Sequence, residues 1–230
     1  MIRYSLVEDK NQREIVLLKA SPCIWSRCSF CDYIHDNSED TAANVRLNKD
    51  VLENITGKYR SLEVINSGSC FELPKDTLTD VKEAIFSKGI EKLFLESHWI
   101  YRNRLNEMRQ FFEVPIIFKC GIETFDDNFR NNVLNKGAIF SGPEEVSKYF
   151  NSICLMVGIK GQTKDMIKKD IEYLLEYFQY GCINMYVENT TPLKRDSELI
   201  QWFRENYSFL EHNDNIEVLW NNTDFGVGGE

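Results

Sequence analysis

Residues 20–36 read Ala-Ser-Pro-Cys-Ile-Trp-Ser-Arg-Cys-Ser-Phe-Cys-Asp-Tyr-Ile-His-Asp and follow directly on the run Glu-Ile-Val-Leu-Leu-Lys at 14–19. That apolar run is typical of a buried strand. Cys23, Cys28 and Cys31 therefore lie, at C-x4-C-x2-C spacing, on the loop that leaves the carboxyl end of the strand. Active sites of α/β barrels are built on such loops. The stretch predicts a functional cysteine site at a strand end.

Beyond this loop, apolar runs alternate with amphipathic ones. The predicted strands are 14–19, 61–66, 91–96, 115–120, 152–157, 183–187 and 216–220. The predicted helices are 47–59, 75–88, 103–112, 127–136, a turn that starts at Pro143, 164–180 (ended by Gly181) and 196–207. Six strand–helix units in alternation imply parallel strands with right-handed crossovers. We expect one α/β domain over 1–230, a partial (β/α)6 barrel, with a doubly wound sheet as the alternative.

The composition narrows the class of protein. The 230 residues are 43% apolar and 27% charged, and the net charge is −9. An acidic chain argues against a nucleic-acid partner, which needs clustered Lys and Arg. The amino-terminal residues do not resemble a signal peptide, and no apolar run is long enough to span a membrane. We therefore expect a cytoplasmic protein without a membrane partner.

Seven cysteines in a reducing compartment are expected to remain thiols. A close group of three then indicates metal binding or catalysis rather than disulfides. Three thiolates could hold a [4Fe–4S] cluster and leave one iron open. With His35 they could instead form a closed Cys3His zinc site in a non-catalytic binding module. An iron–sulfur electron carrier or sensor is a third alternative, and the spacing alone leaves all three open.

The sequence around these cysteines resembles the radical S-adenosylmethionine superfamily. Its usual signature is C-x3-C-x2-C with an aromatic residue before the last cysteine, and Phe30 holds that position here, although the first gap is one residue longer. Three later stretches are similar to family motifs, in the same order and each at a predicted strand end. They are Asn-Ser-Gly-Ser at 66–69, Cys-Gly-Ile-Glu-Thr-Phe-Asp-Asp at 120–127 and Val-Gly-Ile-Lys-Gly-Gln-Thr at 157–163.

The resemblance implies a [4Fe–4S] cluster on Cys23, Cys28 and Cys31, with S-adenosylmethionine bound at the fourth iron. One electron, from a donor such as a flavodoxin or ferredoxin, would then produce a 5′-deoxyadenosyl radical that takes hydrogen from a small-molecule substrate. The residues that the resemblance places near S-adenosylmethionine are Phe30, Ser67, Gly68, Ser69, Glu123, Arg130 and Gly158.

Within the superfamily, the chain is similar to the small queuine lyases. These enzymes release 7-aminomethyl-7-deazaguanine from queuine for queuosine salvage, so a lyase that acts on a 7-deazaguanine base is expected; another small molecule is the alternative. Candidate substrate residues at other strand ends and in the tail are Phe71, Glu96, His98, Asn184, Tyr186, Glu188 and Asp224. Glu96, Glu188 and Asp224 are the hypothesised acceptors for the N–H groups of the base.

Overall fold

The computed structural model describes residues 2–221. Its strands are β1 (Tyr4–Val7), β2 (Arg13–Leu18), β3 (Ser61–Asn66), β4 (Lys92–Glu96), β5 (Ile116–Glu123), β6 (Ser152–Val157), β7 (Tyr180–Met185) and β8 (Ile216–Leu219). Its α-helices are α1 (Thr41–Leu52), α2 (Lys75–Lys88), α3 (Leu105–Phe112), α4 (Pro143–Ser147), α5 (Lys164–Tyr177) and α6 (Ser197–Tyr207). Shorter helical turns span Tyr33–Asp36, Cys70–Glu72, Trp99–Arg104, Phe129–Val133 and Ser208–His212.

The strands follow one another in the sheet in chain order, from β1 to β8. The pairs from β2 to β5 and from β6 to β8 are parallel, as alternation with helices requires. β1 is antiparallel to β2 and was not predicted from the sequence. The α/β fold class that the sequence predicts is confirmed.

By its internal contacts the chain divides into two compact units. The first comprises Met1–Ser26 and Tyr33–Lys119, and the second comprises Arg27–Asp32 and Cys120–Glu230. The cysteine loop therefore contributes to both units. One domain over 1–230 stays a prediction.

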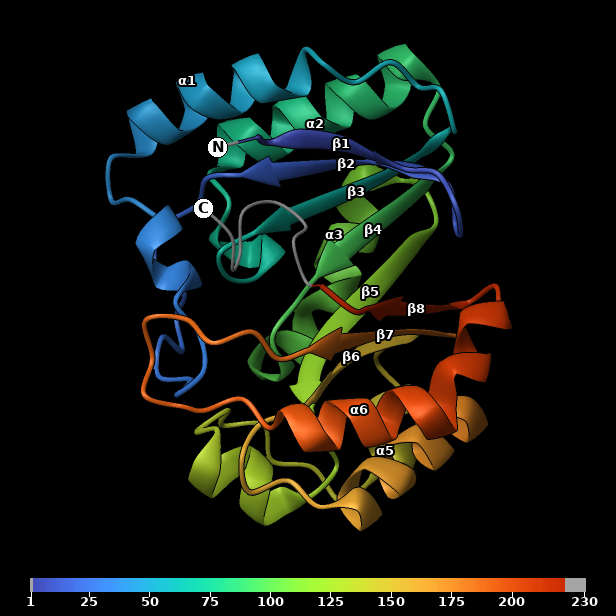
Figure 1. Ribbon diagram of the computed structural model, residues 1–230. Coiled ribbons are helices and arrows are strands. Elements are labelled where there is room, and N and C mark those ends of the chain that lie inside the picture. Colours follow the sequence, from blue (N-terminus) through green and yellow to red (C-terminus); the bar gives the residue numbers. More distant parts are fainter. Residues whose placement is uncertain (1, 222–230) are drawn as a thin grey trace. The chain divides into compact units, whose positions relative to one another are not determined.

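In the first unit, the sheet has one apolar face and one charged face. Successive side chains of a strand point to opposite faces. Leu93, Leu95 and Phe118 are at most 1% exposed, and α3 covers this face through Arg109, which lies over the Phe118 ring. In Figure 1, α1 and α2 run side by side, and α1 also packs along β2. The other face carries charged side chains that become part of the candidate site.

In the second unit, α5 and α6 pack against β6 (Figure 1). The α5 helix begins as predicted, because the Thr163 side chain accepts a hydrogen bond from the Met166 N–H. Its predicted end was wrong: Gly181 lies inside β7. A Cβ at Gly181 would lie 2.4 Å from Leu174, so this glycine lets α5 pack closely on the strand.

The predicted helix 47–59 is the largest error, because the helix observed there is α1, Thr41–Leu52. Asp40 caps its start by accepting a hydrogen bond from the Ala43 N–H. Asn48 is fully buried and bonds both the N–H and the carbonyl of Lys19. The buried face of α1 is thus partly polar, so a search for apolar periodicity misplaced the helix.

The predicted helix 127–136 is reduced to the π-helical turn Phe129–Val133. The buried Arg130 side chain bonds the carbonyls of Thr124 and Ala138, which a regular helix would not bring to it. Elsewhere, Gly89 ends α2 in the left-handed conformation, with φ 66°, as its sequence position predicts. Within residues 2–221, no helix has both the length and the apolar character needed to span a membrane.

Candidate active site

The turn after β3, residues 66–69, is built around buried polar atoms. Asn66 Nδ2 donates to the carbonyl of Ser69 at 3.1 Å, and Ser69 Oγ accepts from the His98 N–H at 2.9 Å. Asn66 Oδ1 and Ser67 Oγ are buried and find no hydrogen-bond partner among residues 2–221. Buried polar atoms without a partner are rare in folded proteins. The turn therefore offers acceptors to a ligand.

Gly68 brings this turn against the cysteine loop. A Cβ there would lie 2.8 Å from Glu72 Oε2 and 3.2 Å from the Cβ of Cys23. Real Cβ atoms essentially never come within 3.0 Å of another atom, so a side chain here would displace the Glu72 carboxylate and crowd Cys23. The sequence predicted Gly68 as a cofactor residue, and the structure places it beside a predicted cluster ligand.

Glu72 connects three parts of the first unit through hydrogen bonds. Its carboxylate accepts from the Ser69 N–H, from the Ile24 N–H at 3.3 Å and from the Tyr101 hydroxyl at 2.9 Å. Burial raises the pKa of Glu72, and these hydrogen bonds oppose the rise. From the sequence, Glu72 is a candidate substrate residue beside Phe71. Its bonds to Ile24 and Tyr101 were not predicted, because these partners are distant in the chain.

Replacing Glu72 by Ala should loosen the cysteine loop at Ile24. Three donors would lose their acceptor, and each unsatisfied buried donor costs about 1–3 kcal/mol. We expect the free energy of unfolding to fall by roughly 2–4 kcal/mol and the iron bound per chain after reconstitution to fall with it. Denaturant unfolding and iron analysis measure both. Glu72→Gln should be milder, and Glu83→Ala on the exposed face of α2 is the control; wild-type iron content in Glu72→Ala would contradict the role.

Two predicted substrate residues of the first unit, His98 and Phe71, lie next to aromatic rings. Trp25, from the cysteine loop, stacks on His98 with ring centroids 6.0 Å apart and an interplanar angle of 15°. Phe71 stacks on Tyr101 at 4.7 Å. Nδ1 of His98 accepts from the Ile100 N–H, which leaves Nε2 as the position for a proton on the neutral ring. Flat rings and an N–H donor suit a heteroaromatic substrate.

In the second unit, Glu123 and Lys136 form a buried ion pair. Lys136 Nζ lies 2.8 Å from Glu123 Oε1 and 5.3 Å from the ring centroid of Phe30. Burial by itself lowers the pKa of Lys136, but the charge of Glu123 outweighs it and raises that pKa above its ordinary value. Glu123 has φ 68°, a left-handed conformation that side chains rarely adopt. Strain of this kind clusters at functional sites.

Phe30 anchors the second part of the cysteine loop. Its ring packs on a buried cluster made of Phe129, Leu134, Ile159 and Tyr186. The Phe30 carbonyl accepts from Asn189 Nδ2 at 2.7 Å, and the neighbouring Ser29 N–H donates to the Leu134 carbonyl at 2.9 Å. Within the loop, the Cys31 N–H donates to the Cys28 carbonyl at 3.3 Å. The aromatic residue before the last cysteine thus holds the loop in place.

Three hydrogen bonds and one aromatic ring hold the Arg130 side chain inside the second unit. Its guanidinium donates to the carbonyls of Ala138 and Thr124 and to Asp127 Oδ1, at 2.7, 3.0 and 2.7 Å, and lies 3.8 Å from the centroid of Phe140. Burial lowers the pKa of Arg130, while nearby carboxylates oppose that shift. The structure gives Arg130 a role in holding the chain after β5, and its contact with a cofactor stays a prediction.

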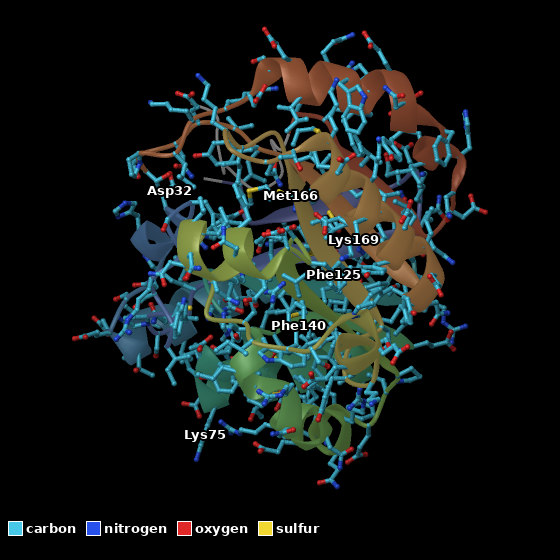
Figure 2. All side chains as sticks on the ribbon, turned by 90° about the horizontal axis from the view of Figure 1, so that it is seen from below. Asp32, Lys75, Phe125, Phe140, Met166 and Lys169 are labelled. Carbon is cyan, nitrogen blue, oxygen red and sulfur yellow. The ribbon has the colours of Figure 1, made fainter. Side chains whose placement is uncertain are left out.

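Asp170 of α5 forms a hydrogen bond with the segment that follows Glu123. Asp170 Oδ1 accepts from the Phe125 N–H at 2.7 Å. Phe125 in turn packs edge to face on Phe140, with centroids 5.9 Å apart (Figure 2). Burial raises the pKa of Asp170 to about 7, against the opposing hydrogen bonds from Phe125 and Thr124.

This raised pKa should make stability depend on pH. The folded state binds the Asp170 proton more tightly than the unfolded state, whose pKa is near 3.8. The stabilisation is therefore complete below about pH 4 and is lost as the pH rises through 7. Asp170→Asn keeps an acceptor for Phe125 without a charge, so its melting temperature relative to wild type should rise by roughly 5–10 °C between pH 5 and 8. A constant difference across that range, measured by calorimetry, would contradict this.

Gly158 allows a close approach at the end of β6. It has φ 95°, and a Cβ there would lie 2.2 Å from Cγ1 of Ile200 in α6. Gln162 Oε1 accepts from the N–H groups of Gly158 and Ile159 at 2.8 and 2.9 Å. The predicted cofactor glycine thus sits in a turn that Gln162 shapes.

The remaining predicted substrate residues differ in their surroundings. Asn184 Oδ1 lies 3.5 Å from Cys182 Sγ on the same face of β7. Tyr186 belongs to the buried cluster under Phe30, and its hydroxyl donates to the Leu193 carbonyl at 3.3 Å. Glu188 accepts from the Arg195 N–H at 3.0 Å and from Lys194 Nζ at 3.4 Å. Asp224 lies outside the described residues.

The seven thiols fall into two classes. Cys23, Cys28 and Cys31 are half-buried, while the remaining four are buried. His35 is exposed, in the turn Tyr33–Asp36. Among residues 2–221, no three His, Cys, Asp or Glu side chains already converge on the position of one metal ion. A four-iron cluster does not require such convergence, because each thiolate binds a different iron.

Comparison with known proteins supports this picture. The chain is 53% identical to a queuine lyase from Clostridium spiroforme, solved with S-adenosylmethionine and queuine bound; the TM-score is 0.97 and the match covers 100% of both chains. SuiB from Streptococcus suis, bound to S-adenosylmethionine, is 15% identical with TM-score 0.57 over 89% of this chain and 46% of that one, which shows the fold.

A curated relative, an uncharacterized protein of Methanocaldococcus jannaschii, is 27% identical over 144 residues; the match covers 53% of this chain and only 38% of that protein. No family model matches the chain. The partial α/β barrel that the sequence predicts is the fold of its structural neighbours. Full-length identity of 53% places the chain in a family: it belongs to the queuine lyases of the radical S-adenosylmethionine superfamily.

Proposed function

We propose that the protein is a queuine lyase, which uses S-adenosylmethionine to release 7-aminomethyl-7-deazaguanine from queuine for queuosine salvage. The full-length match to a queuine lyase that was solved with both molecules bound carries the proposal. The buried acceptors at the turn 66–69 and the strained Glu123 agree with it, because each offers a ligand site at a strand end.

Cys23, Cys28 and Cys31 are the proposed ligands of the [4Fe–4S] cluster. Their donor set fits, since three half-buried thiols on one loop supply thiolates for three irons and leave the fourth iron for S-adenosylmethionine. When bound, the cluster supplies the electron that cleaves S-adenosylmethionine into methionine and a 5′-deoxyadenosyl radical. The protein orients the reactants and keeps water away from them.

The chain's own residues would hold S-adenosylmethionine. Asn66 Oδ1 and Ser67 Oγ are acceptors without partners among residues 2–221, so they suit its ammonium group. Glu123, fixed by Lys136, suits the ribose hydroxyls. The backbone groups of the turn at Gly158 would contact the adenine. Ser69, Gly68 and Phe30 would act by shaping these surfaces.

For the substrate, we propose Phe71, Glu96, His98 and Asn184 as the binding residues. Tyr186 and Glu188 are candidates with a weaker case, because their side chains already hold their own segments. An electron donor such as a flavodoxin or ferredoxin would reduce the cluster. Free cysteines and an oxygen-sensitive cluster suit the cytoplasm.

The test is an anaerobic turnover assay. The protein is reconstituted with iron and sulfide, reduced, and mixed with S-adenosylmethionine with and without queuine. We expect 5′-deoxyadenosine in both mixtures, more of it with queuine, and 7-aminomethyl-7-deazaguanine only with queuine. A loaded enzyme that makes 5′-deoxyadenosine but leaves queuine intact would disprove the substrate. A colourless zinc protein that makes none would disprove the class.

A further inference from the structure

The charged face of the first unit carries four ionised side chains in a row. Arg13 Nε lies 2.5 Å from Glu63 Oε2, Lys119 Nζ lies 2.5 Å from Glu63 Oε1, and Lys119 Nζ lies 3.9 Å from Glu96 Oε1. Arg13 also lies over the Phe94 ring at 5.0 Å. The row Arg13–Glu63–Lys119–Glu96 alternates in sign, so Glu63 lies between two cations and Lys119 lies between two carboxylates.

From Glu63 through Lys119 to Glu96, the side chains of this row become more exposed. The side chain of Glu63 is 0% exposed, Arg13 is 3%, Lys119 is 11% and Glu96 is 35% exposed. Glu96 and Lys119 are direct neighbours in the register of β4 and β5, so their side chains leave the sheet on the same face. Glu96 is the last residue of β4, at the edge where sites of parallel sheets are built. The row thus ends in an accessible carboxylate beside a nearly buried ammonium group.

The edge of a 7-deazaguanine base is complementary to this pair. It presents a carbonyl oxygen as acceptor, followed by a ring N–H and an exocyclic amino group as donors. A carboxylate accepts two parallel N–H bonds, and a lysine has three N–H donors and no acceptor. Glu63 uses one of the Lys119 donors, and its charge fixes the position of Nζ.

From this complementarity we infer that Glu96 and Lys119 together recognise the deazaguanine edge of the substrate. Glu96 accepts from the ring N–H and the exocyclic amino group, and Lys119 donates to the carbonyl oxygen. Glu63 and Arg13 are positioning residues that keep Lys119 in place. This assignment rests on the proposed function, and it identifies the deazaguanine edge as the part of the substrate that these residues recognise.

Of the three carboxylates considered from the sequence, Glu96 and Glu188 lie in the described residues, and the surroundings of Glu96 suit the base edge better. Glu188 is held by the backbone of Arg195 and by Lys194, at the loop that precedes α6. Its cation partner differs from Lys119, because Lys194 is 61% exposed and its charge is largely screened by water. A site rejects a base without the amino group when the protein groups that would bind that amino group are shielded from water and are left unpaired. The charged row places such groups beside Glu96.

The experiment measures binding to the cluster-loaded protein with S-adenosylmethionine and without a reductant, so that no turnover occurs. The two probes are queuine and its 2-desamino analogue, and calorimetry gives their dissociation constants. Wild type should prefer queuine by about 10- to 100-fold, as expected for hydrogen bonds to a charged group. Glu96→Gln should weaken queuine binding at least about tenfold and bring the preference near one, because an amide cannot accept both donors.

Two further variants make the result specific. Lys119→Arg keeps a charge for Glu63 but moves the donor, so it should weaken both probes and leave their ratio unchanged. Glu91→Gln, an exposed carboxylate just before β4 that pairs with Arg60, should bind as wild type does. Glu91→Gln should also form 5′-deoxyadenosine without queuine as wild type does, because the exposed Glu91–Arg60 pair takes no part in the site.

The outcomes separate this inference from the proposed function. If Glu96→Gln binds queuine as tightly as wild type and still discriminates against the analogue, the assignment to Glu96 and Lys119 is wrong while the enzyme remains a queuine lyase. If the wild-type protein does not bind queuine, the proposed function fails, and this assignment fails with it.

Discussion

Replacing Cys23, Cys28 or Cys31 by Ala should abolish 5′-deoxyadenosine formation, by more than about a thousandfold for each variant, because the cluster that they are proposed to hold carries the chemistry and the protein has no substitute for it. Each variant should also lose iron and the brown absorbance of the cluster after anaerobic reconstitution. The effect should be equal at the three positions, since each thiolate holds its own iron. Iron analysis and chromatography of the product measure the two losses independently.

The matched controls are His35→Ala and Cys182→Ala. His35 is exposed and would be needed only by a Cys3His zinc site. Cys182 is a buried thiol of β7 that faces Cys154 in the register of β6 and β7. Both variants should keep their iron and their activity. Loss of bound metal in His35→Ala, with zinc in the wild-type protein, would replace the cluster by a structural zinc site.

Much of the site could be predicted because it depends on local sequence. The cysteine loop follows a strand that its apolar run identifies, and Phe30 stands in a fixed position within the loop. Gly158 and Thr163 lie at a turn and a helix start whose chemistry is local. The structure confirms the Thr163 helix cap, and it places Phe30 against a buried cluster and Gly158 in a close turn; the contacts of Phe30 and Gly158 with a cofactor stay predictions.

The hydrogen bonds that sequence reasoning missed join distant parts of the chain. Glu72 reaches Ile24 and Tyr101, and Asp170 reaches Phe125 from 45 positions away. One signal was present: Glu63 and Lys119 interrupt apolar runs that were predicted as strands, and a charge inside a buried strand needs an opposite charge. The pattern indicates that a partner exists but cannot name it, because the register between strands is fixed only when the sheet forms.

Glu63→Gln should be the most destabilising single substitution in the first unit. It leaves Arg13 and Lys119 buried without the carboxylate that both contact, and removing one partner of a buried ion pair costs about 3–5 kcal/mol. Burial by itself would raise the pKa of Glu63, but the charges of Lys119 and Arg13 outweigh it and hold that pKa at about 2. Denaturant unfolding of the cluster-free protein measures the loss at neutral pH.

The same substitution has a defined pH dependence. Because the folded pKa lies below the unfolded value of 4.5, the stabilisation by ionised Glu63 is complete above about pH 5 and is lost as the pH falls toward 2. The wild-type advantage over Glu63→Gln should therefore be constant from pH 7 to 5 and then shrink by on the order of 3 kcal/mol. Glu8→Gln, in an exposed pair with Lys58, should unfold as wild type does. If wild type is still more stable than Glu63→Gln at pH 2 by the same amount, Glu63 stabilises the protein by packing rather than by its charge. Lys119 would then not need the charge of Glu63 to hold its position.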